Sequence, residues 1–318
     1  MPALFLLLAC AMWGLSFPLV KALQFDQLAR LPDASGWFLT CWIQSARCAI
    51  GALLMLPFLI RSGLPSLREF RQGSWIAFFG GTGLALQVDG LAYTQASTSA
   101  FLTQAYCVVL PLVVCLRSRK WPTRRVIAAT LLIIAGCAVL SGFGFEQTQL
   151  GRGEIETLVS AVFFALMILT LENPKFRGNR CLPVTWVMNG VIAALFLPLA
   201  WISAPSPEAV LVAACSLQSM TMSFCLAAFC SVGAFLLMNH WQPRISAVEA
   251  GVIYSSEPVF TALYSLFLPA WLSTWAAVNY PNESFTLALI LGGGLIISAN
   301  LLMQSGRKPH RPSIAPAP

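Results

Sequence analysis

The chain has 318 residues, of which 58% are hydrophobic and only 10% are charged, with a formal net charge of +7. Apolar runs of membrane-spanning length recur from end to end, which excludes a soluble globular protein and leaves little room for a soluble domain. These runs do not alternate apolar and polar residues as the strands of a β-barrel do, so the sequence predicts an all-α integral membrane protein.

A helix needs about 20 mostly apolar residues to cross the hydrocarbon core of a bilayer. Runs of that kind predict ten transmembrane helices, with boundaries good to about four residues. In chain order they cover 3–23, 38–60, 74–94, 99–116, 124–141, 154–171, 184–203, 219–239, 247–268 and 285–304.

The first two predicted helices carry aromatic and basic side chains of interest. Helical spacing places Trp13 and Phe17 on one face of the helix over 3–23. We expect both rings to line an amphipathic substrate pocket, although aromatic residues in membrane helices are more often packing or lipid-facing residues. Arg47 lies inside the second helix, where a charge is costly unless it faces a partner or a water-filled path.

The third predicted helix, 74–94, has one side rich in small and polar residues. That side comprises Gly80, Gly83, Gln87, Gly90 and Thr94. Its glycines allow another helix to approach closely, and Gln87 is expected to face the substrate cavity. Asp89 lies at a depth compatible with Arg47. We therefore expect an ion pair that braces or gates the outer side, with substrate contact as the alternative.

The fourth and ninth predicted helices share a pattern, because each begins with small and polar residues and then carries a proline. The prolines are Pro111 and Pro258, and both are expected to kink their helices beside a cavity that satisfies the freed backbone carbonyl. The polar faces comprise Gln95, Ser99, Thr103 and Tyr106 in one helix, and Tyr254, Glu257, Thr261 and Tyr264 in the other. These faces predict a shared cavity near the membrane midplane.

Glu257 is the acid at the centre of the ninth helix and allows two interpretations. In the functional one, it takes up and releases a proton or contacts a cationic group of a substrate. In the structural one, it is hydrogen-bonded to backbone freed by Pro258. The sequence favours neither interpretation over the other.

The basic residues predict the orientation, since Lys and Arg near helix ends stay on the cytoplasmic side. With the N-terminus inside, most of the 19 basic residues fall in cytoplasmic segments, against Lys21, Arg30 and Arg152 outside and Arg47 within a helix. Both termini are therefore expected in the cytoplasm. The stretch 117–125, "RSRKWPTRR", is explained as a cytoplasmic loop, so no nucleic-acid partner is expected.

Two halves of five helices each are predicted. An odd number of helices per half makes the halves inverted, which is the arrangement of many transporters with a site at the repeat interface. We expect one repeat over 1–145, a second over 146–306 and a disordered cytoplasmic tail over 307–318.

Metal and cofactor chemistry have little support in the sequence. The chain has two histidines, and its ten cysteines form no CxxC motif, so the cysteines are interpreted as small packing residues. No cofactor and no metal site are expected. The sequence also lacks a nucleotide-binding P-loop and a catalytic motif such as HExxH, so we do not expect an enzyme.

Four segments resemble the EamA-type transporters of the drug/metabolite transporter superfamily. They are "WGLSFPLVK" (13–21), "LAYTQASTSAFLTQAYCVVLP" (91–111), "KWPTRRVIAATLLIIAGCAVL" (120–140) and "SAVEAGVIYSSEPVF" (246–260). The resemblance covers most of the chain in the family's order. It implies ten helices in two inverted repeats that move small metabolites, often outward across the bacterial inner membrane.

The chain departs from the family pattern after the ninth helix. Members usually carry Gly-Glu there, whereas this chain has a Trp-rich insertion over 268–285, with Glu283 at a position that could correspond to the family's acid. The insertion is expected at the outer membrane–water boundary, where indole rings are favoured.

Together, these features favour a secondary transporter that exports small metabolites such as amino acids by alternating access. The alternatives are a non-transporting membrane scaffold or receptor with the same fold and, less favoured, a membrane-embedded enzyme. The expected partners are the lipid bilayer and a small-molecule substrate, and a homodimer is left open.

Overall fold

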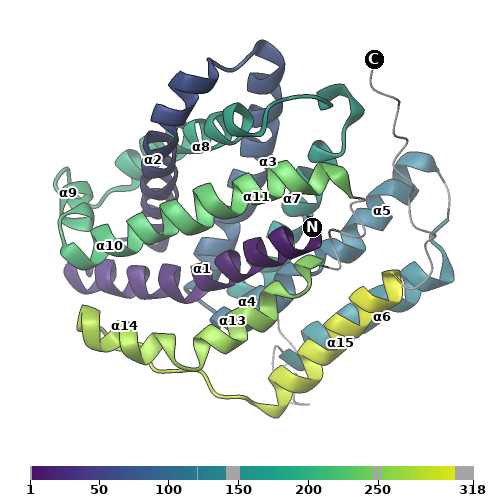
Figure 1. Cartoon of the computed structure of the whole chain (residues 1–318). Helices are drawn as coiled ribbons and strands as arrows, with labels where there is room; N and C mark the ends of the chain where they lie inside the picture. The colour runs from purple at the N-terminus through teal and green to yellow at the C-terminus, as the bar shows by residue number, and fades with distance from the viewer. Residues whose placement is uncertain (1, 120, 141–150, 246–249, 251–252, 305–318) are drawn as a thin grey trace.

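A computed structural model describes the chain except residues 1, 120, 141–150, 246–249, 251–252 and 305–318 (Figure 1). The described residues form helices and connecting segments without a β-strand, which confirms the all-α class. The longer helices are α1 (Pro2–Arg30), α2 (Gly36–Ser62), α3 (Leu67–Leu91), α6 (Arg124–Leu140), α7 (Arg152–Leu171), α8 (Cys181–Ser203) and α15 (Leu287–Gln304). The shorter ones are α4 (Ala96–Thr103), α5 (Tyr106–Ser118), α9 (Ala209–Ala214), α10 (Leu217–Cys225), α11 (Ala234–Trp241), α13 (Glu257–Ser265) and α14 (Leu268–Ala276).

Local sequence signals set several helix ends. The Ser35 side chain accepts a hydrogen bond from the Phe38 amide at the start of α2. A capping box opens α3, in which Ser66 and Glu69 each accept a hydrogen bond from the other's backbone amide. Gly63 follows α2 with a φ of 87°, a conformation that favours glycine, so the chain turns there into α3.

Helix α1 is longer than the segment 3–23 predicted from its apolar run, because its polar last turns find partners. The Asp26 carboxylate pairs with the Arg30 guanidinium one turn later and accepts a hydrogen bond from the Ser219 hydroxyl at 2.8 Å. The Gln24 side chain donates to the Val88 carbonyl oxygen at 2.7 Å. Because these polar side chains have hydrogen-bond partners, the helix continues past the apolar run.

Two predicted helices are broken. The segment predicted over 99–116 divides into α4 and α5 at Gln104 and Ala105, where the backbone amides bond three residues back, as in a tight 3₁₀ turn. The segment predicted over 247–268 contains α13, and α14 follows α13 at an angle of 53°. Part of that segment, including Glu249, lies outside the described residues.

Among the described residues, five helical segments are long and apolar enough to cross a membrane, or six if α13 and α14 form one bent span. The five are Pro2–Arg30, Gly36–Ser62, Arg152–Leu171, Cys181–Ser203 and Leu217–Arg244. The last of these joins α10 and α11 through a π-helical stretch, Leu226–Gly233. Three further apolar stretches, Ala96–Leu110, Ile127–Gly136 and Leu287–Ala299, are shorter. The count of ten spans in two repeats stays a prediction.

Helices from the early and late parts of the chain pack against one another. α2 lies against α8, α3 against α7, α1 against α13, and α6 beside α15 (Figure 1). The predicted glycine side of α3 faces α7: Gly80 lies against Met167, Gly83 against Phe164 and Gly90 against Gly153. The close approach inferred from those glycines is therefore confirmed.

Candidate functional site

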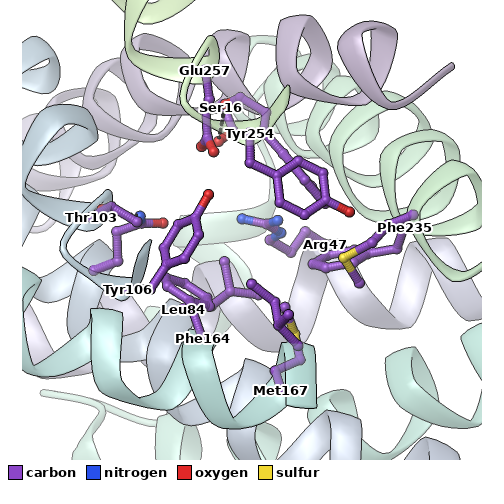
Figure 2. A pocket seen from close by; sticks show the side chains of 14 residues that line it. Ser16, Arg47, Leu84, Thr103, Tyr106, Phe164, Met167, Phe235, Tyr254 and Glu257 are labelled. Atoms are coloured by element: carbon purple, nitrogen blue, oxygen red, sulfur yellow. Dashed lines mark hydrogen bonds between the residues drawn. The ribbon is translucent and has the colours of Figure 1, made fainter. Parts of the chain in front are cut away.

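A cavity lies where α1, α2, α3, α7, α11 and α13 meet, beside the break between α4 and α5 (Figure 2). It holds an empty volume of about 530 Å³, part of which is open to solvent. One part of its wall is apolar, made by Leu84, Phe164, Met167, Ile168, Phe235 and Met238.

Six of the residues expected in the cavity do line it: Trp13, Gln87, Thr103, Tyr106, Tyr254 and Glu257. The Gln87 amide donates to the Thr103 hydroxyl at 2.9 Å, which joins α3 to the end of α4. The Thr103 hydroxyl donates in turn to the Ser99 carbonyl oxygen at 2.8 Å. The cavity therefore has a fixed polar wall on this side.

Two aromatic rings form a second wall. The Trp13 ring meets the Tyr254 ring edge-on, with centroids 5.6 Å apart, and meets the Phe235 ring in the same manner at 5.4 Å. The Tyr254 hydroxyl turns away and donates to the Gln242 side chain at 2.8 Å. Tyr254 thus presents mainly its ring to the cavity.

Four of the expected residues are not part of the cavity lining: Phe17, Gln95, Ser99 and Thr261. Phe17 packs in an apolar cluster with Val20 and Leu226, and Gln95 is exposed just before α4. The Ser99 hydroxyl is hydrogen-bonded to that of Thr157 at 3.2 Å. The Thr261 hydroxyl donates to the Glu257 carbonyl oxygen at 3.2 Å.

The expected ion pair between Arg47 and Asp89 is not formed. The Asp89 carboxylate pairs with Arg152 at the start of α7 and lies 3.3 Å from the Thr40 hydroxyl, whereas the Arg47 guanidinium lines the cavity. Because α2 and α3 run antiparallel, Thr40 is level with Asp89. Arg47 is seven residues further along α2, about 10 Å away at the rise of a helix.

One of the two predicted kinks, that at Pro258, needs correction. Pro258 does not bend the middle of a helix: it stands in the first turn of α13, where a missing amide hydrogen costs no helical hydrogen bond. Glu257 consequently occupies the start of that helix, where the helix dipole favours a negative charge. Pro111 falls within α5, and its side chain lies outside the described residues.

The sequence reasoning missed Ser16 and the whole apolar wall. Its members on α7 and α11 are apolar residues in largely apolar helices, so nothing in their own sequence marked them. The glycines of α3 gave an indirect signal, because Gly80 and Gly83 face α7 beside the cavity residues Met167 and Phe164.

Polar contacts hold the helix ends near Glu283. The Glu283 carboxylate accepts hydrogen bonds from the Ala96 amide at 2.8 Å and the Ser97 amide at 3.3 Å, so it caps α4 from a distant part of the chain. The Lys21 ammonium of α1 donates to the Thr94 carbonyl oxygen just before α4. These contacts tie α1, α4 and the segment before α15 together.

A second set of contacts lies at the other end of α3. The Arg180 guanidinium binds the Glu69 carboxylate with nitrogen–oxygen distances of 2.8 and 2.9 Å and also donates to the Ser62 and Leu64 carbonyl oxygens. The Asn179 amide donates to the Gln72 side chain at 2.7 Å. The α2–α3 connection is thereby joined to the start of α8.

Comparison with known proteins places this arrangement in context. Residues 1–142 match the EamA-like transporter family. An uncharacterized transporter of Archaeoglobus fulgidus is 29% identical over 297 residues, covering 92% of this chain and 84% of the relative.

A crystal structure of another protein superposes with a TM-score of 0.51 at 15% identity, covering 92% of this chain and 95% of that one. At that identity the likeness concerns the fold alone. The family match and the name of the relative support a multi-pass membrane transporter. Residues 1–142 accordingly carry the match to the EamA-like transporter family, which is part of the drug/metabolite transporter superfamily.

Proposed function

We propose that this protein is a secondary transporter that exports small metabolites, such as amino acids, across the bacterial inner membrane by alternating access. The observation that carries the proposal is the cavity among α1, α2, α3, α7, α11 and α13, with polar groups on one side and an apolar wall on the other. Such a mixture suits a small amphipathic solute.

The proposed architecture has ten membrane spans in two inverted repeats, 1–145 and 146–306, with both termini in the cytoplasm. The pairing of α2 with α8, α3 with α7 and α1 with α13 supports it, because each pair joins one proposed repeat to the other. The cavity likewise draws residues from both, such as Arg47 and Glu257. The distribution of basic residues supports the orientation.

Alternating access requires contacts that hold one end of the cavity closed and then separate. The cap that Glu283 places on α4 and the contact between Lys21 and Thr94 have the required position in the proposed topology, at the outer ends of their helices. We propose that these contacts separate when the cavity opens outward, while the Glu69–Arg180 contacts hold the cytoplasmic end.

The test is transport of a panel of labelled amino acids and related metabolites into proteoliposomes, with and without an imposed pH gradient. Wild type is compared with Glu257→Gln, which keeps the side-chain shape but cannot exchange a proton. If Glu257 couples proton movement to transport, wild type moves at least one compound faster with the gradient, and uptake by the variant does not respond to the gradient. Equal behaviour of both proteins under both conditions would make Glu257 structural. Absence of movement by wild type would contradict the transport proposal.

A further inference from the structure

We propose, building on the transport function above, that the substrate carries both an anionic and a cationic group, bound by Arg47 and Glu257 respectively. Both side chains point into the same cavity from different helices (Figure 2). No ion pair joins them among the described residues. The two opposite charges are therefore held apart, each with a face toward the cavity.

Arg47 is the anchor for the anionic group. It comes from the middle of α2 and is only 2% exposed, so its charge has little access to bulk water. Its Nε donates to the Ser231 hydroxyl at 2.9 Å, while neither terminal nitrogen has a hydrogen-bond partner within the described part of the chain. A guanidinium offers five N–H donors, and the unused ones suit a carboxylate bound through both oxygens.

Two neutral donors lie in the same cavity. The Trp13 indole nitrogen and the Tyr106 hydroxyl are buried, and neither has a hydrogen-bond partner in the described structure. The indole N–H can only donate, and the Tyr106 hydroxyl points into the space between Arg47 and Glu257 (Figure 2). These groups add to the donors available for an anionic group.

Glu257 is the anchor for the cationic group. It is 8% exposed, and its carboxylate forms no ion pair with any described residue. Its place in the first turn of α13 stabilises the negative charge through the helix dipole. An ammonium group of a substrate would supply the counter-charge that the surrounding protein does not.

The arrangement disfavours substrates with one charge or none. A purely cationic solute would leave the Arg47 charge buried and unpaired, because arginine stays protonated in proteins. A purely anionic solute would leave Glu257 without a counter-charge, either as an unpaired carboxylate or protonated, and would lack the second charge pair. An unpaired buried charge is strongly unfavourable, so each charge selects against the solute that lacks its partner. The apolar wall, which includes Leu84 and Phe164, accommodates the uncharged remainder of the substrate.

The experiment uses matched solutes that differ in one charge at a time. L-Leucine carries both charges, leucinamide only the cation, and 4-methylpentanoate only the anion; a second set is built in the same way on L-phenylalanine. Binding is measured by ligand-induced thermal shift of the purified protein, and transport by uptake into proteoliposomes. Wild type, Arg47→Gln, Arg47→Lys and Glu257→Gln are compared at equal amounts of folded protein.

For wild type we expect at least one amino acid to bind about tenfold more tightly than both of its singly charged analogues. Arg47→Gln should weaken binding of that amino acid about tenfold without weakening binding of its amide, whereas Arg47→Lys restores part of the preference. Glu257→Gln should do the converse, leaving the carboxylate analogue unaffected. The wild-type comparison remains decisive if a variant does not fold.

The outcomes separate this inference from the transport proposal. An amide or a carboxylate analogue that binds as tightly as its amino acid would overturn the two-charge inference, even if transport occurs. If Arg47→Gln weakened binding of the amino acid, its amide and its carboxylate analogue by the same factor, the role of Arg47 would be overturned. Selective binding of an amino acid without uptake would support the two-charge site and contradict transport, and neither binding nor uptake of any compound would contradict both.

Discussion

Glu69 and Arg180 illustrate what a single charge contact does at the end of a helix. The hydrogen-bonded Arg180 guanidinium, helped by the Ser66 and Arg180 backbone amides, lowers the pKa of the Glu69 carboxyl from 4.5 to about 2. Glu69 lies outside the predicted span 74–94, and its carboxylate both caps α3 and joins that helix to the residue before α8. The contact contributes most to the stability of the fold at pH values where Glu69 is ionised.

The pH dependence of this contact has a defined sign. Because the folded-state pKa lies below the ordinary value, Glu69 contributes stability that is complete above about pH 4.5 and is lost as the pH falls to about 2. We expect wild type to exceed Glu69→Gln in melting temperature by a constant amount above pH 5 and by a shrinking amount below it. Glutamine is a suitable comparison, since it retains the capping-box pattern. A difference that stays constant down to pH 2.5 would contradict the role of the carboxylate.

Residue-level prediction succeeded where the information was local. The helical spacing of Gln87 with Gly83 and Gly90 describes α3 correctly, since the glycines lie against α7 and Gln87 lines the cavity. It failed for Arg47, because the partner of a buried charge depends on how far one helix is shifted along its neighbour. That shift is set by the packing of whole faces and is not encoded in either helix alone.

Helix breaks determine which faces reach the cavity. A continuous helix over 99–116 would place Ser99 and Tyr106 on one side, but the turn at Gln104 separates them, so Tyr106 lines the cavity and Ser99 contacts α7. Likewise, Pro258 begins a helix instead of bending one. The prolines and polar residues signalled irregularity in these segments, whereas the position of each break depends on the surrounding helices.

Close packing between α3 and α8 gives a prediction at the scale of helices. A Cβ atom added at Gly73 would lie 2.7 Å from the Val187 side chain and 2.9 Å from the Val184 carbonyl oxygen, so α8 would have to move. Such overpacking costs about 1–3 kcal/mol. We expect Gly73→Ala to lower the free energy of unfolding in detergent relative to wild type.

Gly190 provides the matched control, because it lies within α8 and a Cβ atom there meets nothing within 4 Å. Replacing a helical glycine with alanine gains up to about 1 kcal/mol of helix propensity at either position. Gly190→Ala should therefore unfold at the wild-type temperature or above it. Equal unfolding of the Gly73 and Gly190 variants would show that the two helices do not meet as described.

At the scale of the whole molecule, the composition predicted the membrane class and the helical fold, and the family resemblance predicted a transporter domain, which the match over residues 1–142 confirms. The apolar wall could not be predicted in this way, since Phe235 and Met238 look like any other packing residues of a membrane helix. Their role follows only from the assembly of helices that are distant in the sequence.

The central claim is that solute passes through the cavity, and uptake into proteoliposomes by two tryptophan variants tests it most directly. Leu84→Trp fills the cavity, whereas Leu131→Trp adds the same ring to an exposed position of α6. Both variants are compared with wild type at equal amounts of folded protein, using each compound that wild type transports. We predict that Leu84→Trp lowers uptake at least about tenfold, while Leu131→Trp leaves it unchanged. Uptake by Leu84→Trp at the wild-type rate would contradict the account.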